Sequence, residues 1–454
     1  MRLALVLALI SGTALAQGRV YDRTCDVTSR RSSRGGVACG SVSYAQFEFA
    51  PASGAGMGAA CACTTPTAAT GEAMTFSRAS VAWCTKGNET SGIANGDLVE
   101  CASGQPRVMP GGDGTGGLGL SVWEARTNSA LRSQELENAA WVLLGVTAAA
   151  PTRTANYATA PDGTATAERL QFVATGAAEG SVVYQTVGGG GVANSIGVYL
   201  KGASSAGTVD VCSSNGASYS CTACTFVAAT WTRCLRENTV VAAGVDLVIG
   251  NASWRNGGTT RVANDVLVWQ ADQQVGATMG PPITTTSAAA TRLGELADVA
   301  LTFGAGTTGF STAQTTVYPE GASPNYGDGL SRVLNGVPGT GVPGGAAASV
   351  NGSYPFPSAA SLFTQDCNPS APNTHTNARR SISGPLNRFV TYFNPVGAAN
   401  LFGCVNDICD DGVAATWTAP TWTRYRLGNY TVSSGSTNAV IKKVCLDPSP
   451  LRCR

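Results

Sequence analysis

Apolar and polar side chains alternate along much of the chain with the two-residue period of a β-strand. The clearest case is the run in which Ile196, Val198 and Leu200 are separated by Gly197 and Tyr199. Because successive side chains of a strand point to opposite faces, the three aliphatic residues are expected in a core and Tyr199 on the other face.

The same reading predicts many short strands and no long amphipathic helix. Strands are predicted at 182–187, 196–201, 208–212, 230–235, 245–249 and 266–269, and later in the chain at 389–393, 400–404, 423–427 and 439–446. Asn-Gly pairs at 215–216 and 256–257 are typical of the turns between such strands. The sequence therefore predicts an all-β fold.

An internal repeat suggests how the strands are grouped. Residues 229–233, Ala-Thr-Trp-Thr-Arg, recur at 420–424 as Pro-Thr-Trp-Thr-Arg. Strand-like segments flank both copies, and 265–272 matches 439–447. Chance similarity in a sequence of low complexity is the alternative. We expect two tandem antiparallel β-sandwich domains of jelly-roll or concanavalin-like type, after a Cys-rich N-terminal region.

The first residues are typical of a secretory signal peptide. A charged start precedes an apolar run from Leu3 to Ile10, and small residues follow up to Ala16. A buried first strand is the alternative. The run is too short to cross a bilayer, so a secreted or cell-surface protein without membrane insertion is expected. The predicted divisions are 1–16 signal peptide, 17–127 Cys/Gly-rich N-terminal region, 128–292 first sandwich and 293–454 second sandwich.

Composition supports export and argues against nucleic-acid binding. The chain has 15 Cys, and behind a signal peptide these indicate disulfides. Hairpin-closing pairs are predicted for Cys212 with Cys221 and for Cys404 with Cys409. The odd total leaves at least one thiol that is either free or paired between chains, as in a homo-oligomer. A net charge of +1 provides no basic patch for nucleic acid.

Catalytic patterns are weak, so we expect no enzyme and no cofactor. The single histidine, His375, has no Gly-x-Ser-x-Gly elbow to accompany it. Asp407, Asp410 and Asp411 cluster near Cys409 and are a candidate structural Ca²⁺ site, although a solvated turn explains them as well. A glycan hydrolase with two dispersed carboxylates is the remaining catalytic alternative.

Aromatic residues beside polar groups are the best candidates for ligand binding. Trp254, Arg255 and Asn256 form a loop-like stretch in which a flat ring neighbours groups able to bond hydroxyls. Tyr184 and Tyr199 are expected on the non-core faces of their strands. Packing roles for these rings are the alternative reading.

Several short blocks resemble those of phage tail-fibre and head-spike proteins, in the same order. They lie at 76–80, 106–108, 119–128, 132–141, 160–167 and 283–292. In that family the first blocks precede a carbohydrate-binding-type β-sandwich, and the resemblance covers about residues 72–292. The last unit resembles a laminin-G or concanavalin-like sandwich. The resemblance implies surface attachment, with glycans or another cell-surface polymer as partner. It transfers no ligand residue, because the blocks are mainly structural.

The chain departs from this family in its signal peptide and its cysteines, which favours an exported cellular protein. The expected function is that of a secreted, disulfide-stabilised, non-catalytic glycan-binding protein of adhesin type. The alternative is a structural or assembly component that packs against copies of itself.

Overall fold

The structure is a computed structural model of the chain. It describes residues 74–300, apart from gaps at 88, 90–91, 111–117, 189, 215–218, 241–243 and 277–278, and elsewhere the backbone of individual strands. The described part is all-β, and its strand pairs are antiparallel, which confirms the predicted fold class. Within these residues no helix is long and apolar enough to cross a membrane.

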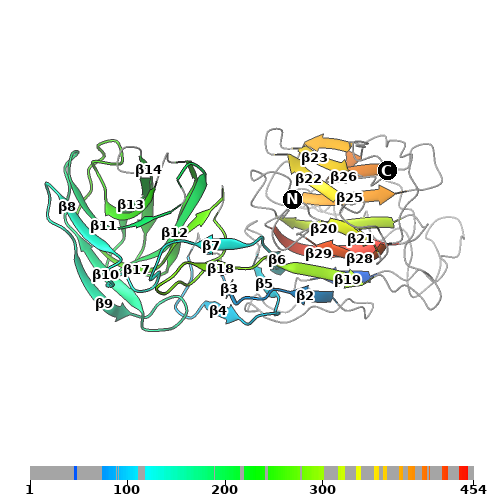
Figure 1. Cartoon of the computed structure of the whole chain (residues 1–454), viewed down its shortest axis with the longest axis horizontal. Helices are drawn as coiled ribbons and strands as arrows, with labels where there is room; N and C mark the ends of the chain where they lie inside the picture. The colour runs from blue at the N-terminus through cyan, green and yellow to red at the C-terminus, as the bar shows by residue number, and fades with distance from the viewer. Residues whose placement is uncertain are drawn as a thin grey trace, which may run out of the picture.

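Residues 126–292 form two sheets that face each other, in one lobe of the molecule (Figure 1). The first sheet has the order β15 (Thr232–Val240), β12 (Ala193–Gly202), β17 (Asn264–Val275), β10 (Ala167–Phe172) and β9 (Thr152–Ala158), with β7 (Arg126–Asn128) pairing β17 and β18 (Ala290–Arg292). The second has the order β14 (Tyr219–Phe226), β13 (Gly207–Ser214), β16 (Val245–Asn251), β11 (Gly180–Val187) and β8 (Val142–Val146).

The core of this lobe lies between the two sheets. Ile196, Val198 and Leu200 of the first sheet share one buried cluster with Val211 and Leu247 of the second. The predicted alternation of β12 is therefore confirmed. Removal of these aliphatic side chains from water is the main force that holds one sheet on the other.

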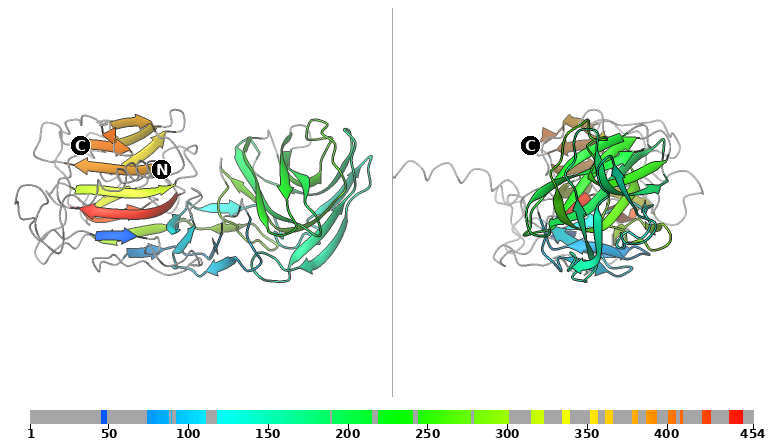
Figure 2. Two further views of the ribbon diagram at one scale, coloured as in Figure 1. Left: turned by 180° about the vertical axis from the view of Figure 1, so that it is seen from behind. Right: turned by 90° about the vertical axis from the view of Figure 1, so that its left-hand side faces the viewer.

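Most other described strands lie in the second lobe, which the left view of Figure 2 shows from behind. One sheet has the order β27 (Ile408–Cys409), β26 (Leu401–Val405), β25 (Asn387–Phe393), β20 (Thr315–Ala322), β29 (Ala439–Asp447), β6 (Leu118–Val122) and β5 (Arg107–Pro110), with β1 (Ala45–Glu48) on β29. Another has the order β2 (Met74–Ser77), β19 (Leu296–Ala300), β28 (Trp422–Leu427) and β21 (Leu334–Pro338), and a third the order β22 (Gly352–Phe356), β23 (Ser361–Gln365) and β24 (Ala378–Ser381). Strands from the predicted N-terminal region thus share sheets with strands from the end of the chain.

The two copies of the sequence repeat have different neighbours in the sheets. The Trp-Thr-Arg segments lead into β15 and open β28, and the downstream segments form β17 and β29, so these strands are confirmed. In the first copy β15 and β17 both pair with β12. In the second copy β28 pairs with β19 and β21, whereas β29 lies in another sheet. The repeated segments do not reproduce one topology.

A hairpin of β3 (Ala82–Thr85) and β4 (Leu98–Cys101) covers the outer face of the first sheet. Trp83 packs edge-on against Trp269, with ring centroids 6.1 Å apart. Ile93 exchanges backbone hydrogen bonds with Trp231, both at 2.8 Å. Tyr199, Trp231 and Trp269 are each 0% exposed beneath this cover. The outer face of the sheet is therefore a second buried core.

Pairs of cysteines at disulfide-bonding distance cross-link several of the described strands. The Sγ atoms of Cys212 and Cys221, which face each other across β13 and β14, lie 2.08 Å apart, as predicted. Cys224 and Cys234 form a further pair that the sequence did not indicate. Cys404 and Cys409 lie opposite each other in the backbone register of β26 and β27. Several sequence predictions lie outside the described residues, namely the predicted signal peptide and the candidates His375, Asp407, Asp410 and Asp411.

Glu168 of β10 gives the fold a pH dependence. It is 1% exposed, and its Oε1 accepts a hydrogen bond from the Glu137 amide at 2.9 Å. Burial, and secondly the Glu137 carboxyl group, raise the pKa of Glu168 from 4.5 to about 9. Between pH 4.5 and about 9, Glu168 is therefore protonated in the folded state and ionised in the unfolded state. The stability contribution is complete below pH 4.5 and declines as the pH rises towards 9.

We expect Glu168→Gln, which keeps the acceptor and cannot ionise, to be more stable than wild type above neutral pH, by about 2 kcal/mol. Urea denaturation followed by tryptophan fluorescence across this pH range measures the difference. Glu135→Gln, at a half-exposed carboxylate, is the control. Parallel stability curves for Glu168→Gln and wild type would contradict the assignment.

Candidate functional site

An open pocket of about 590 Å³ lies where the β16–β17 connection meets β13 and β14. Its lining is mostly polar and consists of Asp210, Tyr219, Ser220, Cys221, Ala223, Arg255, Asn256, Gly257, Thr259 and Arg261. Tyr219 is the aromatic residue among these lining residues, and it is 45% exposed. The pocket thus combines one aromatic ring with several hydrogen-bonding groups, a combination that can contact a ligand with both apolar and polar parts.

The connection between β16 and β17 is a compact loop. Its turn begins with the amides of Arg255 and Asn256, which both donate to the carbonyl of Ala252, at 2.8 and 3.0 Å. Gly257 and Gly258 follow with φ of 83° and 84°, a region in which glycine has no side-chain penalty. The turn predicted from Asn256-Gly257 is confirmed, and it places Arg255 and Asn256 on the pocket wall.

Asp210 anchors this loop from beneath. Its side chain is 0% exposed, and Oδ1 accepts from Nη2 of Arg261 at 2.6 Å. Oδ2 accepts from the Ala252 amide at 3.1 Å and from Nδ2 of Asn256 at 2.9 Å. A buried carboxylate requires such partners, because its desolvation is otherwise very costly. The loop and the strand are therefore tied by charge and by hydrogen bonds.

Trp254 holds Arg255 in position. The Trp254 ring lies over Gly180, where an added Cβ would come within 2.0 Å of it. The guanidinium carbon of Arg255 lies 5.6 Å from the centroid of Trp254 and 5.5 Å from that of Tyr219. Both distances are within the range of cation–π attraction. Arg255 thus contacts two rings at the pocket wall.

The structure brings together some of the predicted ligand residues and separates others. Arg255 and Asn256 line the pocket, and Trp254 supports it from the side. Tyr184 is half-buried on the same outer face of the second sheet, in a cluster that also includes Trp254. Tyr199 is on the predicted face of β12, but it is fully buried against Trp269 and under the β3–β4 hairpin. Its expected exposure is therefore wrong.

Sequence reasoning missed Asp210, Tyr219 and Arg261. Asp210 stands between two valines in a strand, and this position is unusual for a charge without a partner. Tyr219 follows the Asn-Gly pair at 215–216 in the sequence and precedes Cys221 by two residues. The predicted disulfide between Cys212 and Cys221 was a usable signal, because it places Tyr219 at the tip of the β13–β14 hairpin.

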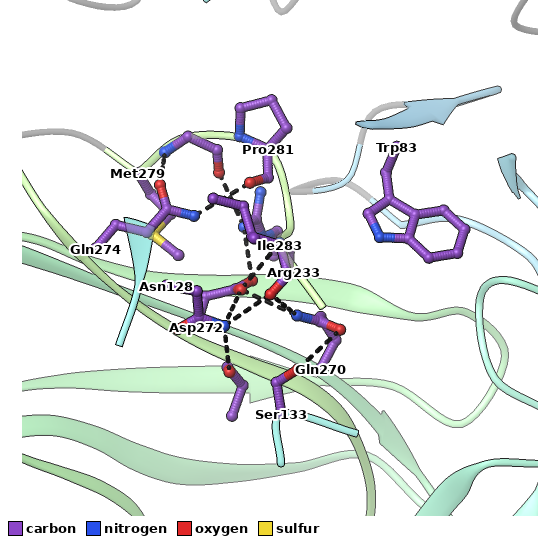
Figure 3. A network of polar contacts seen from close by, with 12 residues as sticks. Trp83, Asn128, Ser133, Arg233, Gln270, Asp272, Gln274, Met279, Pro281 and Ile283 are labelled. Atoms are coloured by element: carbon purple, nitrogen blue, oxygen red, sulfur yellow. Dashed lines mark hydrogen bonds and ion pairs between the residues drawn. The ribbon is translucent and has the colours of Figure 1, made fainter. Parts of the chain in front are cut away.

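A second polar cluster, around Asp272 of β17, is buried and serves to hold the chain together (Figure 3). Asp272 Oδ1 accepts from Asn128 at 2.8 Å, from Gln270 at 3.0 Å and from the Ile283 amide at 3.1 Å. Oδ2 pairs with Arg233 at 3.2 Å. Burial raises the pKa of Asp272 to about 7, against the opposing effect of Arg233. The partners Asn128, Arg233 and Ile283 come from three other segments, so Asp272 joins these segments to β17.

Residues 281–290 are rich in Pro, Thr and Ala, a composition that predicts a linker between the two units, but the first half of this segment is mostly buried. Pro281 and Pro282 are buried, and Ile283 and Thr285 are only 6% and 3% exposed. The Thr285 amide donates to Ser133 Oγ at 2.9 Å. The first half of the segment is therefore packed against the first lobe. The sequence blocks at 119–128, 132–141 and 283–292 come into contact at this place.

Gly180 provides a test of the supporting ring. In Gly180→Ala the new methyl group would overlap Trp254, so the ring must move and release one side of Arg255. We expect a loss of ligand affinity of about tenfold with a stability change near 1 kcal/mol, because Trp254 is only partly buried and can relax. Titration calorimetry and urea denaturation measure the two effects. Gly188→Ala, where no atom lies within 4 Å, is the control.

Comparison with models of known families and with curated proteins finds no match to this chain.

Proposed function

We propose that the chain is an exported, non-catalytic binding protein, and that the pocket around Tyr219 and Arg255 recognises a glycan. The observation that carries the proposal is the composition of this pocket. It offers an exposed tyrosine ring beside side chains of Ser220, Asn256 and Thr259, on the outer face of a sheet. A sugar has apolar C–H faces and many hydroxyl groups, so a ring together with hydrogen-bonding groups suits both.

The finer architecture belongs to the same proposal. We regard the first lobe as a jelly-roll or concanavalin-like sandwich and the second as a further sandwich of this kind. The resemblance of the blocks at 76–80, 106–108 and 119–128 to phage fibre and spike proteins agrees with a role in surface attachment. The signal-peptide pattern and the disulfide-distance cysteine pairs agree with an extracellular location.

Affinity electrophoresis through gels that contain polysaccharides tests this function. The full chain, purified in its oxidised form, should be retarded by at least one polysaccharide of a panel of neutral and acidic types. Tyr219→Ala should lose most of this retardation, because stacking on an aromatic ring is removed. Tyr157→Ala is the matched control, since Tyr157 is 50% exposed in β9 of the other sheet. Equal retardation of the two variants would contradict the assignment of the site.

A further inference from the structure

One cysteine of the first lobe faces the pocket. Six cysteines of the described residues are disulfide-bonded. Five of these six are buried, with exposed fractions between 0% and 8%, namely Cys84, Cys101, Cys212, Cys224 and Cys234. The sixth, Cys221, is only partly buried, and it lines the pocket. Among these six, Cys221 therefore offers the sulfur that a dissolved thiol reaches most readily, through the pocket.

The disulfide of Cys221 fixes one wall of the pocket. This wall belongs to β14 and consists of Tyr219, Ser220, Cys221 and Ala223. β14 is the edge strand of the second sheet, and its Cys221 lies opposite Cys212 of β13. Tyr219 is two residues from Cys221, so both side chains are on the same face of the strand. The disulfide therefore fixes the end of β14 that carries the exposed tyrosine ring.

Thiol–disulfide exchange at this pair has one accessible route, because Cys212 is fully buried. A thiolate attacks Sγ of Cys221, the bond between the two sulfurs breaks, and Cys212 leaves and takes up a proton. With a small dithiol, the second thiol then attacks the mixed disulfide. The reductant becomes a cyclic disulfide and Cys221 is released as a thiol. Cys212 stays beside Val182 and Val248, where it is shielded from reagents.

We propose that the Cys212–Cys221 bond is a redox switch for the pocket, in which a small thiol reductant opens the bond, releases the Tyr219 end of β14 and weakens ligand binding. Without the cross-link, the end of an edge strand opens locally at little cost. A ligand must then order the Tyr219 ring again, which lowers its affinity by about tenfold. Cys224 and Cys234, which join β14 to β15, hold the rest of the strand. The proposal rests on the proposed function, because it concerns control of the same site.

Stepwise reduction of the oxidised full chain tests whether this bond opens before its neighbour. The protein is titrated with dithiothreitol and treated with iodoacetamide, and the labelled peptides are identified by mass spectrometry. We expect label on Cys221 while Cys224 and Cys234 are still unlabelled and tryptophan fluorescence is that of the folded protein. Oxidised glutathione, added in place of iodoacetamide, should close the bond again. Label on Cys224 or Cys234 before Cys221 would overturn the proposal.

Affinity electrophoresis with the same panel of polysaccharides measures the effect on binding. Opening of the bond in the wild type should weaken binding by about tenfold. The double variant Cys212→Ser, Cys221→Ser should bind as weakly as the reduced wild type and should not respond to dithiothreitol. The double variant Cys224→Ser, Cys234→Ser is the matched control and should keep the response.

The outcomes separate the switch from the proposed function. Unchanged retardation after the bond has opened would overturn the switch and leave the proposed function standing. If no polysaccharide retards the oxidised chain, the proposed function fails, and hydrogen exchange then decides on the switch. The amides at 219–223 should exchange faster after reduction, whereas those of β11 and β16 should stay protected. Unchanged exchange at 219–223 would overturn the proposal.

Discussion

Replacement of Glu295 by alanine is expected to destabilise the protein by about 3–5 kcal/mol, because it leaves buried arginines without their carboxylate. Glu295 is fully buried and accepts from Arg78 at 2.8 Å. Arg107 donates to both its oxygens, at 2.9 and 2.7 Å, and the Trp123 amide donates at 2.8 Å. This cluster links the β3–β4 region, β5 and the end of β6 to the segment that follows the first lobe.

Urea denaturation of Glu295→Ala and wild type measures this loss. The control is Glu135→Ala, whose ion pair with Arg132 is at the surface, with side chains 32% and 42% exposed, and should change stability by less than about 1 kcal/mol. Burial raises the pKa of Glu295, but Arg107, Arg292 and Arg78 together bring it below its ordinary value. Its contribution is therefore present above the ordinary pKa and is lost as the pH falls through the folded value. Equal stability of the two variants would contradict the role of the cluster.

Replacement of Asp210 by alanine is the second large change that we expect. It removes the acceptor for Arg261, Asn256 and the Ala252 amide at once, and each of these belongs to the pocket loop. We expect a loss of about 3 kcal/mol, since Arg261 is 13% exposed and can recover some hydration. The loop should also lose its fixed shape, so ligand binding should fall below detection.

The two effects of Asp210→Ala can be separated from a general loss of folding. Asp246→Ala in β16 removes a carboxylate from the same sheet, where it accepts a bond from Thr186 at 2.7 Å at the surface, and should affect neither property strongly. Hydrogen exchange of the amides at 252–261 should increase in Asp210→Ala while the amides of β11 and β16 stay protected. Unchanged exchange in the loop would show that Asp210 does not anchor it.

Local patterns predicted the strands well, because a strand with one face in a core requires alternation along its own length. β11, β12, β13, β16 and β17 all lie where the sequence indicated, and they are longer than predicted. The pattern also predicted the face of Tyr199. The alternation within β12 does not indicate which segment covers that face, because the β3–β4 hairpin comes from a segment about a hundred residues earlier in the chain.

Only part of the pocket could be predicted from the sequence, because the pocket also contains residues from segments that are distant along the chain. The sequence indicated Arg255 and Asn256 because an aromatic, a cation and an amide are adjacent in one loop. Asp210 and Tyr219 come from other strands and meet this loop only after β13, β14 and β16 have paired. Arg261 lies in the loop itself, and its ion pair with Asp210 forms only after this pairing. The repeat misled the expectation of equivalent neighbours, because similarity between strands does not specify which strands pair.

The measurement that tests the central claim most directly is a glycan-array screen of the oxidised full chain beside Tyr219→Ala and Tyr157→Ala. The account predicts saturable binding of at least one glycan by wild type and by Tyr157→Ala, and its loss in Tyr219→Ala. Binding that survives in Tyr219→Ala, or no binding to any glycan by wild type, would contradict the claim that this pocket recognises a sugar.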